Sequence, residues 1–171
     1  MKSINKKIVS INQLYKYKLN RKIGLCWGGF DLLHAGHILH FEFASQKCNT
    51  LIVAINSDET FPDKGENRPL LSEKSRANII ASIEFVDFVT IYYGNYLDPD
   101  NSKGIIHGIV QNTPYIPLDI IIAIKPDFYF KGAEYIDEEI PEKKIVEENG
   151  GKIICGPNNP VFSSSELINK L

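Results

Sequence analysis

The sequence predicts an α/β fold, a doubly wound, Rossmann-like parallel sheet of five strands, within a single domain over residues 1–171. Apolar strand-like runs alternate along the chain with amphipathic helix-like runs. The run at 51–55, Leu-Ile-Val-Ala-Ile, is nearly continuous, as expected of a strand that helices cover on both faces. A glycine-rich segment separates the first strand from the helix that follows it, which is typical of a turn that presents backbone N–H groups.

Five apolar runs are predicted to be the strands: 23–27, 51–56, 85–92, 128–130 and 152–155. Parallel strands joined by right-handed crossovers all end at the same edge of the sheet. Ligands of such sheets bind outside that carboxyl edge. The loops that follow the strands are therefore where we expect the functional residues.

In the first half of the chain, helices are expected at 38–44 and after Ser72, which is a suitable N-cap. The buried stripe of the second helix is predicted to consist of Ile79, Ile80 and Ile83. Residues 1–20 have a weak apolar pattern, which favours a short helix packed on the edge of the sheet.

In the second half, Pro141 is expected at the first position of a helix that Gly150 and Gly151 end. The Ser-x-x-Glu pattern at 163–166 predicts the capping box of a last helix that runs to residue 171. The stretch at about 94–117 is rich in Gly, Asn, Asp and Pro, and we interpret it as an irregular insertion with a short helix at 105–110. A connection of that length is usually functional or part of an interface.

The composition excludes several classes of protein. With 19 basic and 21 acidic residues the net charge is −2, and no basic stripe indicates a nucleic-acid partner. The longest apolar run, 120–124, is too short to cross a membrane, and no apolar region of a secretory signal follows the lysine-rich start. Cys26, Cys48 and Cys155 are odd in number and widely spaced, which predicts reduced thiols and a cytoplasmic protein.

Residues 28–37, Gly-Gly-Phe-Asp-Leu-Leu-His-Ala-Gly-His, are the most informative part of the sequence. A glycine-rich turn between a strand and a helix presents N–H groups at the positive end of the helix, where anions bind. His34 and His37 are three residues apart, so both imidazoles can face the same point. This arrangement suits the binding of a polyphosphate while its α-phosphorus is attacked.

This motif, with Gly28, Phe30, Asp31, His34, Gly36 and His37 at the spacing of the HxGH signature, resembles that of the cytidylyltransferase-like nucleotidyltransferases. The resemblance extends over most of the chain and is strongest to the stand-alone D-glycero-D-manno-heptose-1-phosphate adenylyltransferases. Further similar blocks are 7–14, 54–58, Lys64-Gly65, Arg68-Pro69, Arg76, Val86-Asp87, 131–135 and Ser163-Ser164-Ser165. The resemblance implies the HxGH nucleotidyltransferase fold.

Within the family, Lys131 and the lead-in at 7–14 favour the branch that adenylylates sugar phosphates, as does Asn158 where the cytidylyl branch tends to carry Arg. Two departures point the other way. Trp27 replaces the Asn typical of the heptose group, and the insertion at 94–117 is absent from the usual heptose enzymes. A CTP-dependent enzyme acting on glycerol 3-phosphate or another polyol phosphate is therefore the alternative.

The resemblance implies transfer of an NMP, expected to be AMP from ATP, to a sugar 1-phosphate with release of pyrophosphate. The acceptor phosphate is already anionic at neutral pH, so positioning and charge stabilisation are the expected means of catalysis. The catalytic residues are expected to be His34, His37 and Lys64. The nucleotide-binding residues are expected to be Gly28, Gly29, Phe30, Gly36, Arg76, Lys131, Ser163 and Ser164. The substrate-binding residues are expected to be Asp31, Asp58 and Arg68.

Magnesium is expected to arrive with the triphosphate, held by phosphate oxygens and water rather than by a protein cage. A homodimer is implied by the resemblance, and His40 and His107 are interpreted as structural. Two further functions stay open, an FAD- or dinucleotide-forming adenylyltransferase and a non-catalytic nucleotide-binding module. The acceptor sugar and its pathway (capsule, lipopolysaccharide or another glycan) also stay open.

Overall fold

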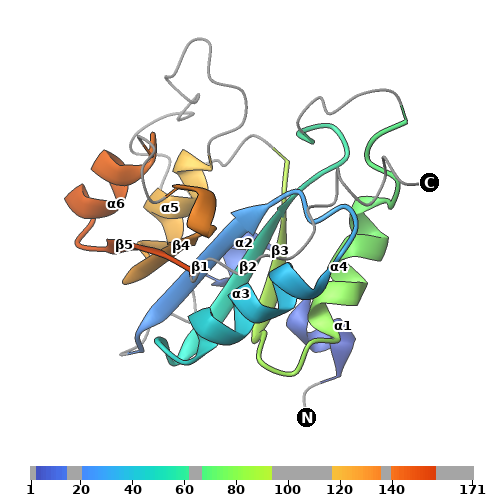
Figure 1. The fold of residues 1–171 in the computed structure, drawn as a ribbon, viewed down its shortest axis with the longest axis horizontal. Helices are drawn as coiled ribbons and strands as arrows, with labels where there is room; N and C mark the ends of the chain where they lie inside the picture. Colours follow the sequence, from blue (N-terminus) through green and yellow to red (C-terminus); the bar gives the residue numbers. More distant parts are fainter. Residues whose placement is uncertain (1–2, 15–20, 62–66, 94–116, 136–139, 157–171) are drawn as a thin grey trace.

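The computed structural model describes residues 3–14, 21–61, 67–93, 117–135 and 140–156. Five parallel strands form one sheet in the order β3-β2-β1-β4-β5 (Figure 1). The strands are β1 (Ile23–Gly28), β2 (Thr50–Asn56), β3 (Phe88–Tyr92), β4 (Phe128–Lys131) and β5 (Lys152–Cys155). The predicted fold class is therefore confirmed, with each strand inside or next to its predicted range.

The strand order reverses at β1, which pairs with β2 on one side and β4 on the other. Cys26 in β1 is in register with Val53 in β2 and with Phe130 in β4. A crevice forms at such a switch point, outside the carboxyl ends of the strands. The turn that leaves β1 therefore starts where a ligand of this fold is expected.

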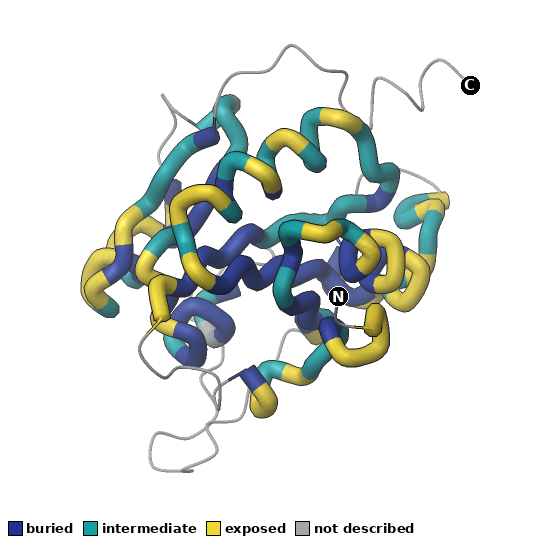
Figure 2. Tube along the Cα trace, turned by 90° about the horizontal axis from the view of Figure 1, so that it is seen from below, coloured by how far each residue is buried: buried dark blue, intermediate teal, exposed yellow. Residues whose placement is uncertain are grey.

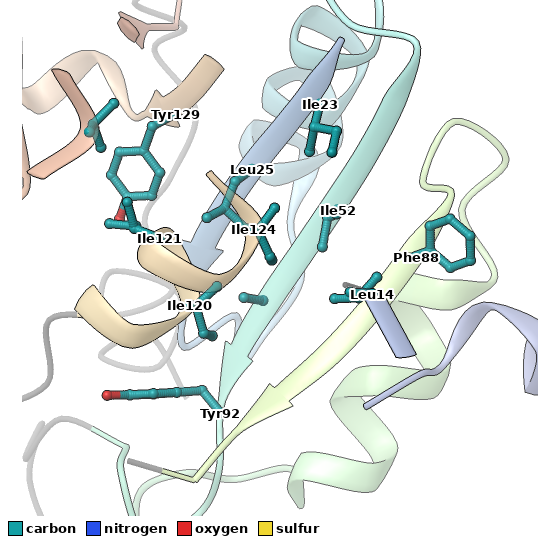
Figure 3. Close-up of a cluster of buried hydrophobic side chains, with 12 residues drawn as sticks. Leu14, Ile23, Leu25, Ile52, Phe88, Tyr92, Ile120, Ile121, Ile124 and Tyr129 are labelled. Atoms are coloured by element: carbon teal, nitrogen blue, oxygen red, sulfur yellow. The ribbon is translucent and has the colours of Figure 1, made fainter. Parts of the chain in front are cut away.

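Helices cover both faces of the sheet (Figure 1). They are α1 (Ile4–Lys7), α2 (Ile11–Leu14), α3 (Ala35–Ser45), α4 (Glu73–Ala81), α5 (Leu118–Ile124) and α6 (Lys143–Glu148), with a 3-10 turn, η2 (Ala133–Tyr135). Helices α3 and α4 pack on one face, around Phe41 and Ile80. Helices α2, α5 and α6 pack on the other face, in the cluster drawn in Figure 3. The sheet is the buried centre, and the exposed residues are concentrated on the helices and turns around it (Figure 2).

The amino-terminal segment packs on the sheet edge, as predicted, but as two short helices rather than one. Between them, Ile8 forms a parallel bridge with Val89 of the edge strand β3. Leu14 of α2 is 3% exposed and joins the core, while the ammonium of Lys7 donates to the carbonyl of Ile83 at 2.8 Å.

Two aspartates close the amino edge of the sheet, opposite the edge where the ligand is expected. The Asp127 carboxylate accepts from the N–H of Ile23 at 2.7 Å, and the Asp87 carboxylate accepts from the N–H of Leu51 at 2.9 Å. Each carboxylate thus satisfies a backbone donor at the start of a strand. β3 starts at Phe88, later than the predicted residue 85, because residues 82–85 form the turn that follows α4.

The structure corrects the predicted stripe of α4. Ile80 is fully buried, but Ile79 is 40% exposed. Successive residues of a helix are about 100° apart, so the two isoleucines cannot both face the core centre. The core face is completed by small residues, Ala77 and Ala81.

Helix α5 is missing from the predictions, which include only the apolar run at 120–124. Ile120, Ile121 and Ile124 are almost fully buried in the core cluster that α5 shares with the sheet, α2 and α6. A helix that is apolar on most sides lacks the periodicity that identifies an amphipathic helix. It ends at Lys125, which has a φ of 46° and precedes Pro126.

The helix predicted to start at Pro141 starts two residues later, at Lys143, and Glu142 occupies its N-cap position. Gly150 follows it with a φ of +84°, which confirms the predicted glycine at its end. The predicted helices at 105–110 and 166–171 lie outside the described residues. In the part that is described, no helix is long and apolar enough to span a bilayer.

Candidate active site

The turn after β1 is held by the ring of Phe30. This residue has a φ of 48°, a left-handed conformation that is uncommon for residues with a side chain. Its ring meets those of His37 and Phe41 edge-on, each at a centroid distance of 5.1 Å. The ring thus faces the α3–α4 core and fixes the turn relative to the first turns of α3.

His34 and His37 lie together at the amino end of α3. Their rings stack with centroids 3.8 Å apart and planes 27° apart. His34 is the N-cap, and its Nδ1 accepts from the N–H of Gly36 at 3.2 Å. The Nδ1 of His37 in turn accepts from the N–H of His34 at 3.4 Å. Because both Nδ1 atoms accept, we assign each proton to Nε2, which makes both Nε2 atoms donors when neutral.

Burial lowers the pKa of His34 below its ordinary value. The ring is therefore neutral at pH 7, where its Nε2–H is a hydrogen-bond donor without a full charge. A neutral His34 ring can stack on the His37 ring at this short distance without the repulsion that two imidazolium ions would have.

The two glycines that start the motif leave space for the surrounding aromatic rings. A Cβ on Gly29 would lie 2.6 Å from Cε2 of Phe61, and one on Gly28 would lie 3.1 Å from Cζ of Phe30. In the structure the first group that a side chain at Gly29 would meet is the Phe61 ring.

Asp31 joins the motif to the segment that leads into α4. Its buried carboxylate accepts from Nε of Arg68 at 2.5 Å and from the N–H of Leu71 at 3.0 Å. Burial alone would raise the pKa of Asp31, but the N–H groups of Leu70 and Leu71 and the Arg68 guanidinium outweigh it and lower the pKa. Asp31 and Arg68, which were expected to bind the substrate, thus form a buried ion pair with each other.

Arg76 is fully buried, although the resemblance implies that it binds the nucleotide. Its Nη2 donates to the Asp58 carboxylate at 2.6 Å, and its Nη1 donates to the carbonyl of Gly29 at 2.7 Å. Glu73 accepts from the N–H of Asp58 at 2.8 Å and from the hydroxyl of Tyr93 at 2.9 Å. Asp58, with 43% of its side chain exposed, and Tyr93, which is 53% exposed, are the parts of this network that face solvent.

Lys131 ends β4 in a cage of aromatic side chains. Its ammonium lies 4.6 Å from the ring centroid of Tyr135, 5.4 Å from that of Tyr129 and 5.6 Å from that of Trp27. It also donates to the Glu142 carboxylate at 2.8 Å, and both partners are buried. Burial first, and then the Glu142 charge, raises the pKa of Tyr129 well above its ordinary value, so Tyr129 stays a donor to that carboxylate.

Sequence reasoning missed Glu142, Asn56 and Phe61. A single acidic residue after Pro141 gives no signal of burial, and Asn56 contributes its backbone carbonyl, which any residue type has. For Phe61 the only clue was an aromatic residue in an otherwise polar loop. His40 approaches the Sγ of Cys26 at 3.6 Å, a contact in keeping with a structural role. Lys64, His107, Asn158, Ser163 and Ser164 lie outside the described residues.

The described residues include no group of three or more His, Cys, Asp or Glu side chains that could hold a metal ion. The site that they form is a stacked pair of imidazoles, a glycine turn and a helix start, at the carboxyl edge beside β1. Such a set of donors can bind a chain of phosphates and stabilise charge that develops on it.

The family model described as cytidylyltransferase-like matches residues 25–170. The chain belongs to the cytidylyltransferase-like family. This membership confirms the resemblance of the 28–37 motif and the expectation of a nucleotidyltransferase.

Two curated relatives within the family are both named bifunctional protein HldE. The one from Desulfatibacillum aliphaticivorans is 36% identical over 149 residues, and the one from Hyphomonas neptunium is 37% identical over 148 residues. Each match covers 86% of this chain and 26% of the relative. The chain therefore spans about a quarter of the length of these relatives.

Two solved structures share the fold of this cytidylyltransferase-like chain. The lipopolysaccharide core biosynthesis protein from Thermoplasma volcanium has a TM-score of 0.59 and 21% identity, over 82% of this chain and 99% of that one. The pantoate-beta-alanine ligase from Francisella tularensis has a TM-score of 0.59 and 18% identity, over 96% of this chain and 72% of that one. At these identities the likeness concerns the fold alone.

Proposed function

We propose that this chain joins the AMP of ATP to a sugar 1-phosphate, with a heptose 1-phosphate as the favoured acceptor, and releases pyrophosphate. The observation that carries the proposal is the stacked pair of His34 and His37 beside the Gly28–Phe30 turn, with both Nδ1 atoms acting as acceptors. The relatives named HldE and the resemblance to heptose-1-phosphate adenylyltransferases support the choice of donor and acceptor.

In the proposed reaction, a phosphate oxygen of the acceptor attacks the α-phosphorus of ATP. The new bond joins this oxygen to the α-phosphorus, and the bond that breaks joins the α-phosphorus to the oxygen that bridges it to the β-phosphorus. Charge moves onto the departing pyrophosphate, where the Nε2–H groups of His34 and His37 donate hydrogen bonds. The attacking oxygen is already anionic, so the reaction requires no general base.

The remaining expected residues keep their proposed roles. The backbone N–H groups of Gly28, Gly29 and Phe30 would bind the α-phosphate, and Ser163 and Ser164 the β- and γ-phosphates. Gly36 would act through His34, whose Nδ1 accepts from the N–H of Gly36. Lys64 would contact the α-phosphate and the acceptor phosphate, and Lys131 the nucleotide. Asp58 is best placed to meet an acceptor hydroxyl because its side chain is 43% exposed. The buried Asp31–Arg68 ion pair would shape the acceptor site indirectly, by holding its backbone in place rather than by contacting the acceptor.

The substrate enters as a magnesium–nucleotide complex, whose ion is held by phosphate oxygens and water. A homodimer in the cytoplasm completes the proposal, and sedimentation of the purified protein tests the oligomeric state. Trp27 favours one alternative, CTP with a polyol phosphate, because an aromatic residue is frequent there in the cytidylyl branch.

The proposal is tested by measuring pyrophosphate release for each of the four nucleoside triphosphates with magnesium and a panel of acceptors. The panel contains heptose 1-phosphate, hexose 1-phosphates, glycerol 3-phosphate and FMN. Release with ATP and a sugar 1-phosphate is expected, and its rate should fall by about 10²–10³ in His34→Asn. Release with CTP and glycerol 3-phosphate alone, with FMN alone, or nucleotide binding without turnover would each overturn the proposal in favour of the corresponding alternative.

A further inference from the structure

The contacts of Arg76 differ from those of a residue that binds a ligand. Its side chain is fully buried, and four of its N–H groups donate to the protein. Nε donates to the carbonyl of Leu71 at 2.9 Å, and Nη1 donates to those of Gly29 at 2.7 Å and Asn56 at 2.8 Å. Nη2 donates to the Asp58 carboxylate at 2.6 Å. Since a guanidinium has five N–H groups in total, little of its donor capacity is left for a phosphate.

The three carbonyls that Arg76 binds belong to three separate segments. Gly29 follows β1, Asn56 is the last residue of β2, and Leu71 lies just before α4. Arg76 therefore ties the ends of two neighbouring strands to the start of the helix behind them. A lysine could not replace it, because an ammonium donates from a single atom and cannot span acceptors that the planar fork reaches together.

The bond to Gly29 also sets the direction of the next N–H group. In a planar trans peptide the C=O and the following N–H point in opposite directions. Because the Gly29 carbonyl points at the buried Arg76, the N–H of Phe30 points away from it. Phe30 has a φ of 48°, a conformation that persists where the surrounding contacts impose it. Arg76 is one of those contacts, and the Phe30 ring is another.

We propose that Arg76 is a positioning residue that directs the Phe30 N–H toward the α-phosphate of the bound nucleotide. This inference depends on the proposed function, in which that N–H donates to the α-phosphate. The sequence analysis expected Arg76 to contact the nucleotide directly, whereas here Arg76 acts through the Gly29–Phe30 peptide. Without the guanidinium, the Gly29–Phe30 peptide loses the contact that orients its carbonyl, and the Phe30 N–H is no longer aligned when charge shifts in the transition state.

The first test is a comparison of Arg76→Lys with Lys74→Gln, an exposed lysine on the same helix. Positioning predicts that kcat of Arg76→Lys falls about 100-fold, the size expected for loss of one transition-state donor, while KM for ATP changes less than about threefold. The control removes a positive charge from α4 and should keep both constants. A kcat within about threefold of wild type would overturn the inference, and so would a KM for ATP raised about tenfold with kcat unchanged.

A second test needs no acceptor and therefore separates this inference from the proposed function. The backbone amide of Phe30 is followed by NMR in the free protein and with α,β-methylene ATP and magnesium. In the wild type its resonance is expected to move on addition of the analogue. In Arg76→Lys it should already be displaced in the free protein and respond less. An amide that behaves identically in both proteins contradicts a positioning role.

If Arg76→Lys does not fold, Asp58→Asn is used for the same NMR measurement. Asp58 meets the guanidinium rather than the Gly29–Phe30 peptide, so a displaced Phe30 amide in the free variant would report coupling through Arg76. An unchanged amide would overturn the inference. If the wild type releases no pyrophosphate with any acceptor, the proposed function fails, and the amide measurement still decides the role of Arg76.

Discussion

At the scale of single residues, the histidine pair combines two tasks that are often separate. The Nδ1 atoms cap and brace the start of α3, and this bonding leaves the protons on the Nε2 atoms. The structural contact thus determines the tautomer that the proposed chemistry requires. A substitution that separates the two tasks is the most informative test.

His34→Asn makes that separation, because an Asn side chain can also accept the N-cap bond. We expect its free energy of unfolding to stay within about 0.5 kcal/mol of wild type, since Asn is among the best N-caps. We expect kcat to fall by about 10²–10³ because the Nε2 donor is lost. His40→Asn, on the same helix, is the control and should keep its turnover. The idea fails if His34→Asn retains most of its activity.

The lowered pKa of His34 also predicts how stability depends on pH. Above pH 6.5 both the folded and the unfolded protein hold this ring neutral, and its contribution to stability is complete. As the pH falls below 6.5, the unfolded chain takes up the proton first, so stability is lost until the folded pKa is passed. Urea unfolding between pH 7.5 and 5.5 should therefore show a larger loss of stability in the wild type than in His34→Asn. Equal losses would contradict the lowered pKa.

At the scale of elements, the turn from β1 to α3 depends on close contact between Gly29 and the ring of Phe61. In Gly29→Ala the new methyl would lie 2.6 Å from Cε2 of that ring, so the turn or the ring must move. We expect a loss of about 1–3 kcal/mol in stability together with reduced turnover. Gly150→Ala is the matched control.

Gly150 has a φ of +84° at the end of α6, and a Cβ added to it would have no atom within 4 Å. Its replacement by Ala should cost about 1 kcal/mol of stability through backbone strain and leave kcat unchanged. Thermal unfolding and turnover are measured for both variants. If Gly29→Ala and Gly150→Ala have the same stability and the same loss of activity, the turn after β1 has no special role in catalysis.

The ion pair between β4 and the start of α6 is the second element-scale contact that can be tested. Glu142→Gln would leave the buried Lys131 ammonium without its carboxylate, and we expect a loss of about 3–5 kcal/mol. The double variant Lys131→Met with Glu142→Leu removes both charges and should recover part of that stability, because the buried Tyr129 hydroxyl still loses its acceptor. If Lys131 contacts the nucleotide as proposed, the recovered protein should still have a KM for ATP raised about tenfold or more, equivalent to about 1.4 kcal/mol. A double variant with wild-type KM would show that Lys131 is structural.

At the scale of the whole molecule, the sequence predicted the sheet well because its strands are apolar runs between clear turn signals. It failed at α5, whose isoleucines are buried on most sides and therefore lack a helical period. It also misjudged Ile79, because the small residues Ala77 and Ala81, rather than a third isoleucine, complete the core face of α4.

The candidate site could be predicted where its chemistry lies in side chains close in sequence, as for His34 and His37. It could not be predicted where a side chain binds backbone carbonyls of distant segments, as Arg76 does at Gly29 and Asn56. Backbone acceptors are the same for every residue type, so a sequence pattern contains no record of such contacts. The buried ion pair of Glu142 with Lys131 could not be predicted for a similar reason, since the end of β4 and the start of α6 meet only in the folded chain.

The two carboxylates of Asp87 and Asp127 at the opposite rim of the sheet have a practical consequence for protein engineering. That rim secures the strand starts, whereas the proposed chemistry takes place at the other end of the same strands. Changes that raise heat resistance can therefore be sought around the aspartates without disturbing the histidine turn. A library of variants restricted to that rim should yield proteins that unfold at a higher temperature and have the substrate preference of the parent protein.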